Sequence, residues 1–380
     1  LDVHFSLNVT GHLWQEDSLG CVGSMEQLGD VLANRSSSFG GLVDIGMTYA
    51  AERDRFWRGA DSLPGGKRLR AYNVMPGDYL GPSFLSYKTK GAHVQEVFDA
   101  IGMDFVTLGN HEFDLQVQDD KLAIAEGMRE TSYKSLTANV ICRNTASCGP
   151  NPARDGGGIP NSGDYQVDEF DGHRVCLFGV TSDPDARAAS RGRGVRFQPY
   201  TDESIHVLKE LKHFECSLVV AMTHLSVGQD LKLWHLAMQC YQAGECPHLD
   251  VIAGSHDHYI ALLNLENPYA THPLRRHTYY WKLGQNGHVL AKYTFDLSWQ
   301  EAPRVSLVPV VEGACSSYVQ HSTLPEKSSE NLQELHAHLS SRLAEHEKAH
   351  GVLRYRQHIL PITFKGRYNT ANCARRETRA

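Results

Sequence analysis

Short runs of apolar and β-branched residues alternate along this chain with segments whose apolar positions repeat at helical spacing. The runs cover residues 69–75, 105–108, 135–141, 174–180, 217–222 and 249–253. The helix-spaced segments include residues 41–56, 118–128, 201–211 and 230–241. Because buried strands and helices follow one another in this order, the pattern predicts an α/β (α+β) protein.

The C-terminal third continues the strands and then changes to a long helix. Residues 279–283 and 289–295 are two further apolar runs, separated by an Asn-Gly pair typical of a tight hairpin. Residues 323–326 resemble a helix capping box, and the helix after it has one apolar edge, formed by Leu332, Leu335, Leu339 and Leu343. We expect the histidines on its other faces to be solvated: His336, His338, His346 and His350.

Size and composition are those of a globular enzyme. The chain has 380 residues, 41% hydrophobic and 21% charged, with a net charge of -7. A chain of this length exceeds the size at which one hydrophobic core stops growing, so we expect one large domain with an appendage, or two domains. The charge balance indicates neither nucleic acid nor an anionic membrane as a partner.

No apolar run approaches the roughly 18 residues of a membrane-spanning helix, so we expect no membrane span. Residues 1–4 form neither a signal peptide nor a start methionine. The sequence leaves the compartment undecided, with the cytoplasm favoured and secretion as the alternative.

The nine cysteines include no short CxxC pair, which argues against a zinc-ribbon site. Cys142 with Cys148, and Cys240 with Cys246, are spaced to close small loops in an oxidising compartment. Cys176 lies inside an apolar run and Cys216 just before another. We therefore expect these two to be buried thiols.

A polar hexapeptide, GNHEFD at residues 109–114, directly follows the apolar run 105–108. Asn110, His111 and Asp114 offer an amide oxygen, an imidazole and a carboxylate, a mixture suited to metal ligation and proton handling. A plain strand-to-loop turn is the alternative for this segment alone. Glu112 and Phe113 receive no chemical role and are expected to be structural.

Other segments place the same kinds of side chain next to the apolar runs. These side chains are Asp2 and His4, Asp78, His224, and His256 with His258. Because ligands gather at the carboxyl ends of strands, we expect the side chains to converge at one edge of a sheet. Without a thiolate, such a set suits Mn, Fe, Co or Zn, and it offers more ligands than one ion needs. The sequence therefore predicts a site for two divalent metal ions.

The order of these motifs resembles the calcineurin-like metallophosphoesterases, and most of all their 5'-nucleotidase and 2',3'-cyclic-nucleotide phosphodiesterase branch. The motifs are D-V-H, G-D, G-N-H-E-F-D, T-H and G-S-H-D-H, and the resemblance covers roughly residues 1–300. It implies a four-layer αββα sandwich, here with a C-terminal helical extension.

The resemblance also implies roles for the residues. One metal would be held by Asp2, His4, Asp78 and His258. The other would be held by Asp78, Asn110, His224 and His256, so that Asp78 bridges the two ions. His111 would face the substrate, and Asp114 would orient it.

The function implied is dinuclear metal-dependent hydrolysis of a small phosphate ester, most simply a nucleotide cleaved as by a 5'-nucleotidase. Within enzymes, the alternatives are a phosphodiesterase or a phosphatase acting on another phosphate ester. Outside enzymes, the alternative is a catalytically silent binding protein with the same fold.

The same resemblance suggests how the chain is divided. We expect a catalytic domain over residues 1–311, and a linker with an amphipathic helix over residues 312–355. Residues 356–380 resemble the opening of the second domain with which members of the nucleotidase branch bind the nucleoside.

Overall fold

The computed structural model describes residues 4–11, 42–61, 69–81, 83–115, 123–142, 148, 157–182, 195–258, 260–283, 287, 289–309 and 326–349. Two large sheets and a two-stranded ladder hold its strands. Within the described residues, no helix is long and apolar enough to cross a membrane.

The first sheet has seven strands in the order β15-β14-β1-β2-β3-β4-β6. Their bounds are β1 His4–Gly11, β2 Leu69–Pro76, β3 Phe105–Thr107, β4 Lys134–Leu136, β6 Ser162–Gly163, β14 Val289–Asp296 and β15 Arg304–Pro309. The pairs from β1 to β6 are parallel, and β14 and β15 add antiparallel strands at one side.

The second sheet has six strands in the order β12-β13-β11-β10-β8-β7. Their bounds are β7 Tyr165–Phe170, β8 His173–Thr181, β10 Leu218–His224, β11 Val251–Gly254, β12 Ile260–Glu266 and β13 His277–Leu283. The four central strands are parallel, and both outer strands are antiparallel.

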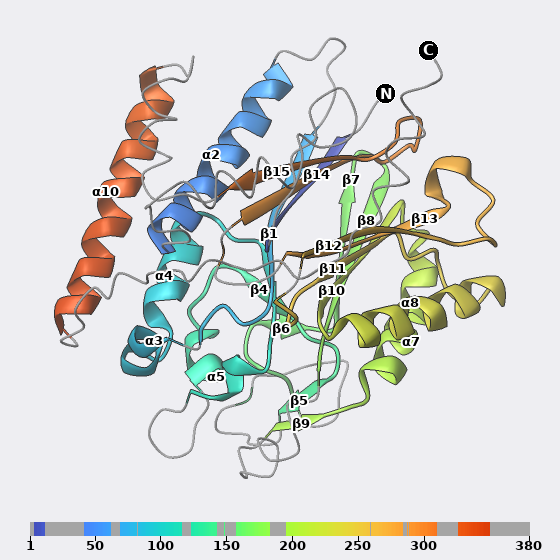
Figure 1. The fold of residues 1–380 in the computed structure, drawn as a ribbon, viewed down its shortest axis with the longest axis horizontal. Coiled ribbons are helices and arrows are strands. Elements are labelled where there is room, and N and C mark those ends of the chain that lie inside the picture. Colours follow the sequence, from blue (N-terminus) through green and yellow to red (C-terminus); the bar gives the residue numbers. More distant parts are fainter. Residues whose placement is uncertain are drawn as a thin grey trace, which may run out of the picture.

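Helices cover the outer face of each sheet, as Figure 1 shows. On the side of the first sheet lie α2 Leu42–Asp61, α3 Phe84–Thr89, α4 Ala92–Ala100, α5 Ala123–Gly127 and α10 Glu326–Ala349. On the side of the second sheet lie α7 Tyr200–Leu211 and α8 Val227–Gln242. The order helix, sheet, sheet, helix confirms the predicted four-layer αββα sandwich.

Three apolar clusters fill the spaces between the layers. The cluster between the sheets takes alternate residues of each strand, such as Tyr72 and Val74 from β2 and Val220 and Met222 from β10. The intervening residues face the helices, which is why central strands such as β10 are apolar over several consecutive positions and not only at every second one. Burial on both faces therefore explains the continuous apolar runs of the sequence.

One predicted strand is divided in the structure. Residues 135–141 form the end of β4 and the start of β5 (Val140–Cys142), and β5 pairs with β9 (Val195–Phe197) outside the main sheets. Asn139 lies in the turn between them, where its side chain accepts from the Thr181 amide at 2.9 Å and donates to the Thr181 carbonyl at 2.8 Å. These bonds replace ladder bonds and redirect the chain toward β8.

The C-terminal helix α10 packs on α2 and α4, with Leu339 buried against them. His336 and His338 are exposed, as expected. The expectation for His346 is wrong, because its Nε2 lies 3.1 Å from Glu96 Oε1 on α4 and its side chain is only 16% exposed. Arg342 holds the same carboxylate with two contacts of 3.0 Å. His350, and the proposed domain start at 356–380, lie outside the described residues, and the domain boundaries stay predictions.

Three disulfides join cysteines within the described part of the chain. The bridges Cys142–Cys148 and Cys240–Cys246 confirm the two predicted loop closures. The prediction of free thiols at Cys176 and Cys216 is wrong, because these residues form a third bridge across 40 positions, with Cα atoms 6.0 Å apart. Cys176 lies on β8 and Cys216 just before the neighbouring β10, so the bridge fastens adjacent strands.

Candidate metal centre

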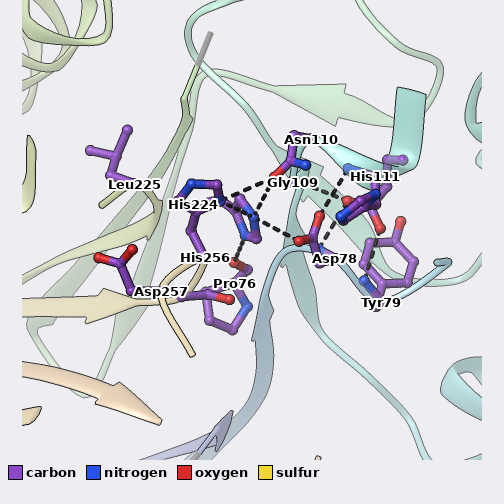
Figure 2. Close-up of polar contacts among 12 residues, drawn as sticks. Pro76, Asp78, Tyr79, Gly109, Asn110, His111, His224, Leu225, His256 and Asp257 are labelled. Carbon is purple, nitrogen blue, oxygen red and sulfur yellow. Dashed lines mark hydrogen bonds and ion pairs between the residues drawn. The ribbon is translucent and has the colours of Figure 1, made fainter. Parts of the chain in front are cut away.

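Polar side chains from both sheets meet where four parallel strands end, as Figure 2 shows. From the first sheet, Asp78 follows the end of β2 and Asn110 follows β3. From the second sheet, His224 is the last residue of β10 and His256 follows β11 by two positions. The sequence-predicted convergence at strand ends is therefore present for these four residues.

Four short contacts link the ligand atoms of these side chains. His224 Nε2 lies 3.0 Å from Asp78 Oδ2 and 3.2 Å from Asn110 Oδ1. His256 Nδ1 lies 3.1 Å from Asn110 Oδ1 and 3.3 Å from His224 Nε2. Among the described residues, Asp78, His224 and His256 are the group of carboxylate and imidazole side chains close enough to share an ion.

These distances fit the coordination shell of one divalent ion. Ligand atoms placed tetrahedrally at about 2.0–2.1 Å from a metal are about 3.3 Å apart. The observed separations of 3.0 to 3.3 Å fall close to that value. Two imidazole nitrogens, a carboxylate oxygen and an amide oxygen are also ligands that Zn, Mn, Fe and Co accept. The residues present therefore fit a metal ion.

Two glycines permit the close approach of the strand ends. A Cβ on Gly77 would lie 2.5 Å from His224 Nδ1, and a Cβ on Gly109 would lie 2.2 Å from Asp78 Oδ1. Gly77 has a φ of +96°, and Asp78 itself has a φ of +54°, in the region that L residues rarely adopt. The turn after β2 is thus held in an unfavourable conformation that aims the Asp78 carboxylate at the histidines.

Glu112 holds that turn in place, a role that the sequence did not reveal. Its carboxylate is fully buried and accepts hydrogen bonds from the backbone amides of Asp78, Tyr79 and Leu80 at 2.8 to 2.9 Å. It also accepts from the Gly109 amide at 2.5 Å. Glu112 therefore connects the turns after β2 and β3. The sequence signal for this role is the position of the Glu112 carboxylate within the hexapeptide 109–114, between the predicted ligand Asn110 and Asp114.

The charged groups of the site influence one another. Burial raises the pKa of the Asp78 carboxyl, but the facing His224 ring and the neighbouring His111 together leave that pKa below its ordinary value. Burial lowers the pKa of His224, but the Asp78 carboxylate, with Glu112 and the Pro76 carbonyl, leaves that pKa above its ordinary value. Burial, followed by the charge of His224, lowers the pKa of His256. A lowered pKa keeps His256 neutral, the form in which imidazole binds metal.

His111 and Asp114 lie beside this cluster and contact each other. His111 Nδ1 lies 2.6 Å from Asp114 Oδ2, and the His111 backbone amide donates to Asp78 Oδ1 at 2.9 Å. The His111 side chain is 34% exposed, so a molecule approaching the cluster can reach it. The contact matches the one expected between an imidazole and its orienting carboxylate, while the roles themselves stay predictions.

Among the described residues, the group of side chains close enough to share an ion does not include the other predicted ligands. Asp2 lies outside the described residues, and His258 is exposed. His4 begins β1, which runs parallel to β2 and pairs His4 with Leu69, whereas Asp78 follows the far end of β2. This corrects the expectation for His4. Strand β1 begins at His4 instead of ending before it, so the His4 backbone lies at the opposite edge of the sheet from Asp78.

No protein-family model matches the chain. Among curated proteins, it is similar to the trifunctional nucleotide phosphoesterase protein YfkN of Bacillus subtilis, with 24% identity over 220 residues. That match covers 50% of this chain and 14% of the relative, so the chain spans a small part of the relative's length.

Solved structures of low sequence identity share the fold. The 5'-nucleotidase precursor of Thermus thermophilus has a TM-score of 0.59 at 16% identity, over 92% of this chain and 59% of that one. The NAD nucleotidase of Haemophilus influenzae has a TM-score of 0.59 at 13% identity, over 94% and 69%. The calcineurin-like phosphoesterase YfkN of Bacillus subtilis has a TM-score of 0.52 at 16% identity, over 90% and 100%. These likenesses establish the fold of the chain.

Proposed function

We propose that this chain, which has the fold of the calcineurin-like phosphoesterases, is a metal-dependent hydrolase of phosphate esters of the 5'-nucleotidase type. The observation that carries the proposal is the convergence of Asp78, Asn110, His224 and His256 from the ends of four strands, with ligand atoms 3.0 to 3.3 Å apart. A strained turn and a buried charge both cost stability, and this cluster contains both. Such features gather at functional sites, so the cluster is better explained by function than by stability.

In the proposal, those four residues would hold one divalent ion, and Asp78 would also contribute to binding a second. The exposed His258 is the described residue that could serve the second ion together with Asp78. Bound ions supply Lewis acidity, which polarises a phosphoryl oxygen and offsets the charge that develops on it.

His111 is proposed to act on the substrate directly. Asp114 Oδ2, 2.6 Å from Nδ1, accepts a hydrogen bond there and keeps a proton on Nδ1. Nε2 is then the ring atom that can contact a phosphate oxygen and release a proton toward the leaving alkoxide. Asp114 fixes the orientation of the ring, and with it the nitrogen that faces the substrate.

The names of the similar proteins support a nucleotide as the substrate. They include a 5'-nucleotidase precursor, an NAD nucleotidase and a nucleotide phosphoesterase. We place a nucleoside monophosphate first, and a phosphodiester or another phosphate ester second. A silent binding protein of the same fold is the remaining alternative, and the intact contact between His111 and Asp114 argues against it.

The disulfides support an oxidising compartment for this protein. Three bridges, one of them joining neighbouring strands of the second sheet, would not persist in a reducing cytosol. The proposed location is therefore outside the cytoplasm, in place of the cytoplasm that the sequence favoured.

Two variants separate the proposed roles. His111→Ala should lower turnover of a nucleoside monophosphate by about 10²- to 10⁴-fold, because a proton donor is lost, while the bound metal measured by elemental analysis stays unchanged. Asp78→Ala should lose metal and turnover together. Loss of metal from the His111 variant would mean that His111 is a ligand and not the proton donor.

A further inference from the structure

One lysine is buried beneath the metal centre, on β13 of the second sheet. The side chain of Lys282 has no exposed surface, although lysine is almost never fully buried without partners. Its ammonium group lies 3.0 Å from Asp230 Oδ2 on α8 and 3.8 Å from Asp257 Oδ2. It also donates to the backbone carbonyls of Leu225 and Ser255.

The two carbonyls are adjacent in sequence to two of the site histidines. Leu225 directly follows His224, and Ser255 directly precedes His256. A lysine ammonium has three hydrogens, and the two carbonyls and the Asp230 carboxylate use all three. A single side chain therefore fastens the two loops that carry the imidazoles.

The register of the strands explains how Lys282 reaches both loops. Thr223 pairs with Gly254, and Gly254 pairs with Lys282, so these three residues form one row across β10, β11 and β13. A Cβ on Gly254 would lie 3.0 Å from Asp230 Oδ2 and 3.2 Å from Lys282 Cγ. Because glycine leaves that space open, the lysine passes over β11 to reach α8.

Asp230 balances the charge of the lysine, and both of its carboxylate oxygens accept further hydrogen bonds. Its Oδ1 accepts from Thr223 Oγ1 at 2.6 Å, and its Oδ2 accepts from the Tyr280 hydroxyl at 3.3 Å. Asp257 accepts from the backbone amide of Val227 at the start of α8. The network thus connects the end of β10, the loop after β11 and the first turn of α8.

We propose that Lys282 is a positioning residue that fixes the backbone on both sides of the metal centre, so that His224 and His256 present their nitrogens to one ion. The metal part of this inference rests on the proposed function, and the backbone part does not. A buried lysine paired only with Asp230 would serve stability alone. The two carbonyl bonds, each next to a histidine, indicate positioning as well.

The test uses a double variant, Lys282→Met with Asp230→Asn, which removes both buried charges together and keeps a side-chain oxygen at position 230 that can accept from Thr223. A single Lys282→Met change would leave a buried carboxylate uncompensated and unfold the protein for an unrelated reason. Lys282→Gln with Asp230→Asn is the second variant, because glutamine is polar but too short to reach both carbonyls.

Two readouts are measured on each folded variant. Hydrogen exchange of the metal-free protein should become at least about 10-fold faster at residues 224–227 and 254–257 and stay unchanged in the central strands. The affinity for Zn²⁺ or Mn²⁺, measured by competition with a chelator, should fall by about 10- to 100-fold, as is typical when a residue supporting a metal ligand is removed. The control is Lys292→Met with Glu52→Gln, which removes a similar pair, 2.9 Å apart, between β14 and α2.

The outcomes separate this inference from the proposed function. Unchanged exchange at both loops in a folded variant would overturn the positioning role. Faster exchange with unchanged metal affinity would overturn the link between the lysine and the metal centre. A wild-type protein that binds no divalent ion and cleaves no phosphate ester would refute the proposed function, while the exchange result would still decide whether Lys282 holds the loops.

Discussion

Glu112 offers a quantitative test of how the metal centre is built. Its Oε1 accepts from the amides of Tyr79 and Leu80, and its Oε2 accepts from those of Asp78 and Gly109. Glu112→Gln keeps the size of the side chain but replaces one oxygen by an NH₂ group, which cannot accept. Two of the four backbone amides then lose their acceptor and face a donor instead.

The magnitude follows from those two amides. Leaving a buried amide without a partner destabilises a protein by about 1–3 kcal/mol, so two amides give about 2–6 kcal/mol. A domain is typically stable by about 5–15 kcal/mol, so we expect the variant to fold but to unfold at clearly lower urea concentration. The turn that aims Asp78 should also loosen, and metal affinity should fall with it.

The assay is urea unfolding of the metal-free protein at pH 8. This pH is chosen because burial, followed by the charge of Asp78, raises the pKa of Glu112 to about 7, and the carboxylate must be ionised to accept all four bonds. Glu126→Gln is the matched control, because Glu126 Oε1 is buried without a hydrogen-bond partner among the described residues. A Glu112 variant within about 0.5 kcal/mol of the wild type, the scatter of ordinary surface substitutions, would refute the reasoning.

Two further predictions concern stability away from the metal centre. Replacing Cys176 and Cys216 by alanine should lower the free energy of unfolding by up to about 4 kcal/mol, because their bridge closes a loop of 40 residues in the unfolded chain. The same change at Cys240 and Cys246, which are separated by 6 residues, should lower it by up to about 2 kcal/mol. Equal effects of the two changes would count against loop entropy as the cause. Burial, followed by the neighbouring His346, lowers the pKa of His93 to about 4. As the pH falls from about 6.5 toward 4, the unfolded state therefore binds a proton at His93 before the folded state does, and the folded state becomes less stable. Between pH 7 and pH 4.5, the free energy of unfolding measured in urea should fall by about 2–3 kcal/mol more for the wild type than for His93→Gln.

Much of the fold could be predicted because the central strands are buried on both faces. Continuous apolar runs such as 174–180 and 217–222 identify such strands directly. Parallel strands place their carboxyl ends at the same edge, so the polar residues after them converge without further information. This is why Asn110, His224 and His256, distant in sequence, could be grouped before the structure was known.

The features that the sequence missed depend on contacts between distant segments. The Cys176–Cys216 bridge requires β8 and β10 to be neighbours, which no local pattern reveals. The burial of Lys282 depends on the absence of a Cβ at Gly254, which lets the lysine side chain pass. The position of His4 follows from the pairing of β1 with β2, because a short motif alone does not show whether its strand precedes or follows it.

The most direct test of the account is a metal titration of the protein after chelator treatment. Bound ion is followed by calorimetry, and hydrolysis of an aryl phosphate and of a nucleoside 5'-monophosphate is followed in parallel. We expect no hydrolysis by the stripped protein, activity that rises in proportion to bound Zn²⁺ or Mn²⁺, and neither binding nor hydrolysis by Asp78→Asn, whose ligand atoms otherwise stand as in the wild type. Hydrolysis that persists in the stripped protein, or full metal binding by the Asp78 variant, would contradict the assignment of Asp78, Asn110, His224 and His256 as the metal centre.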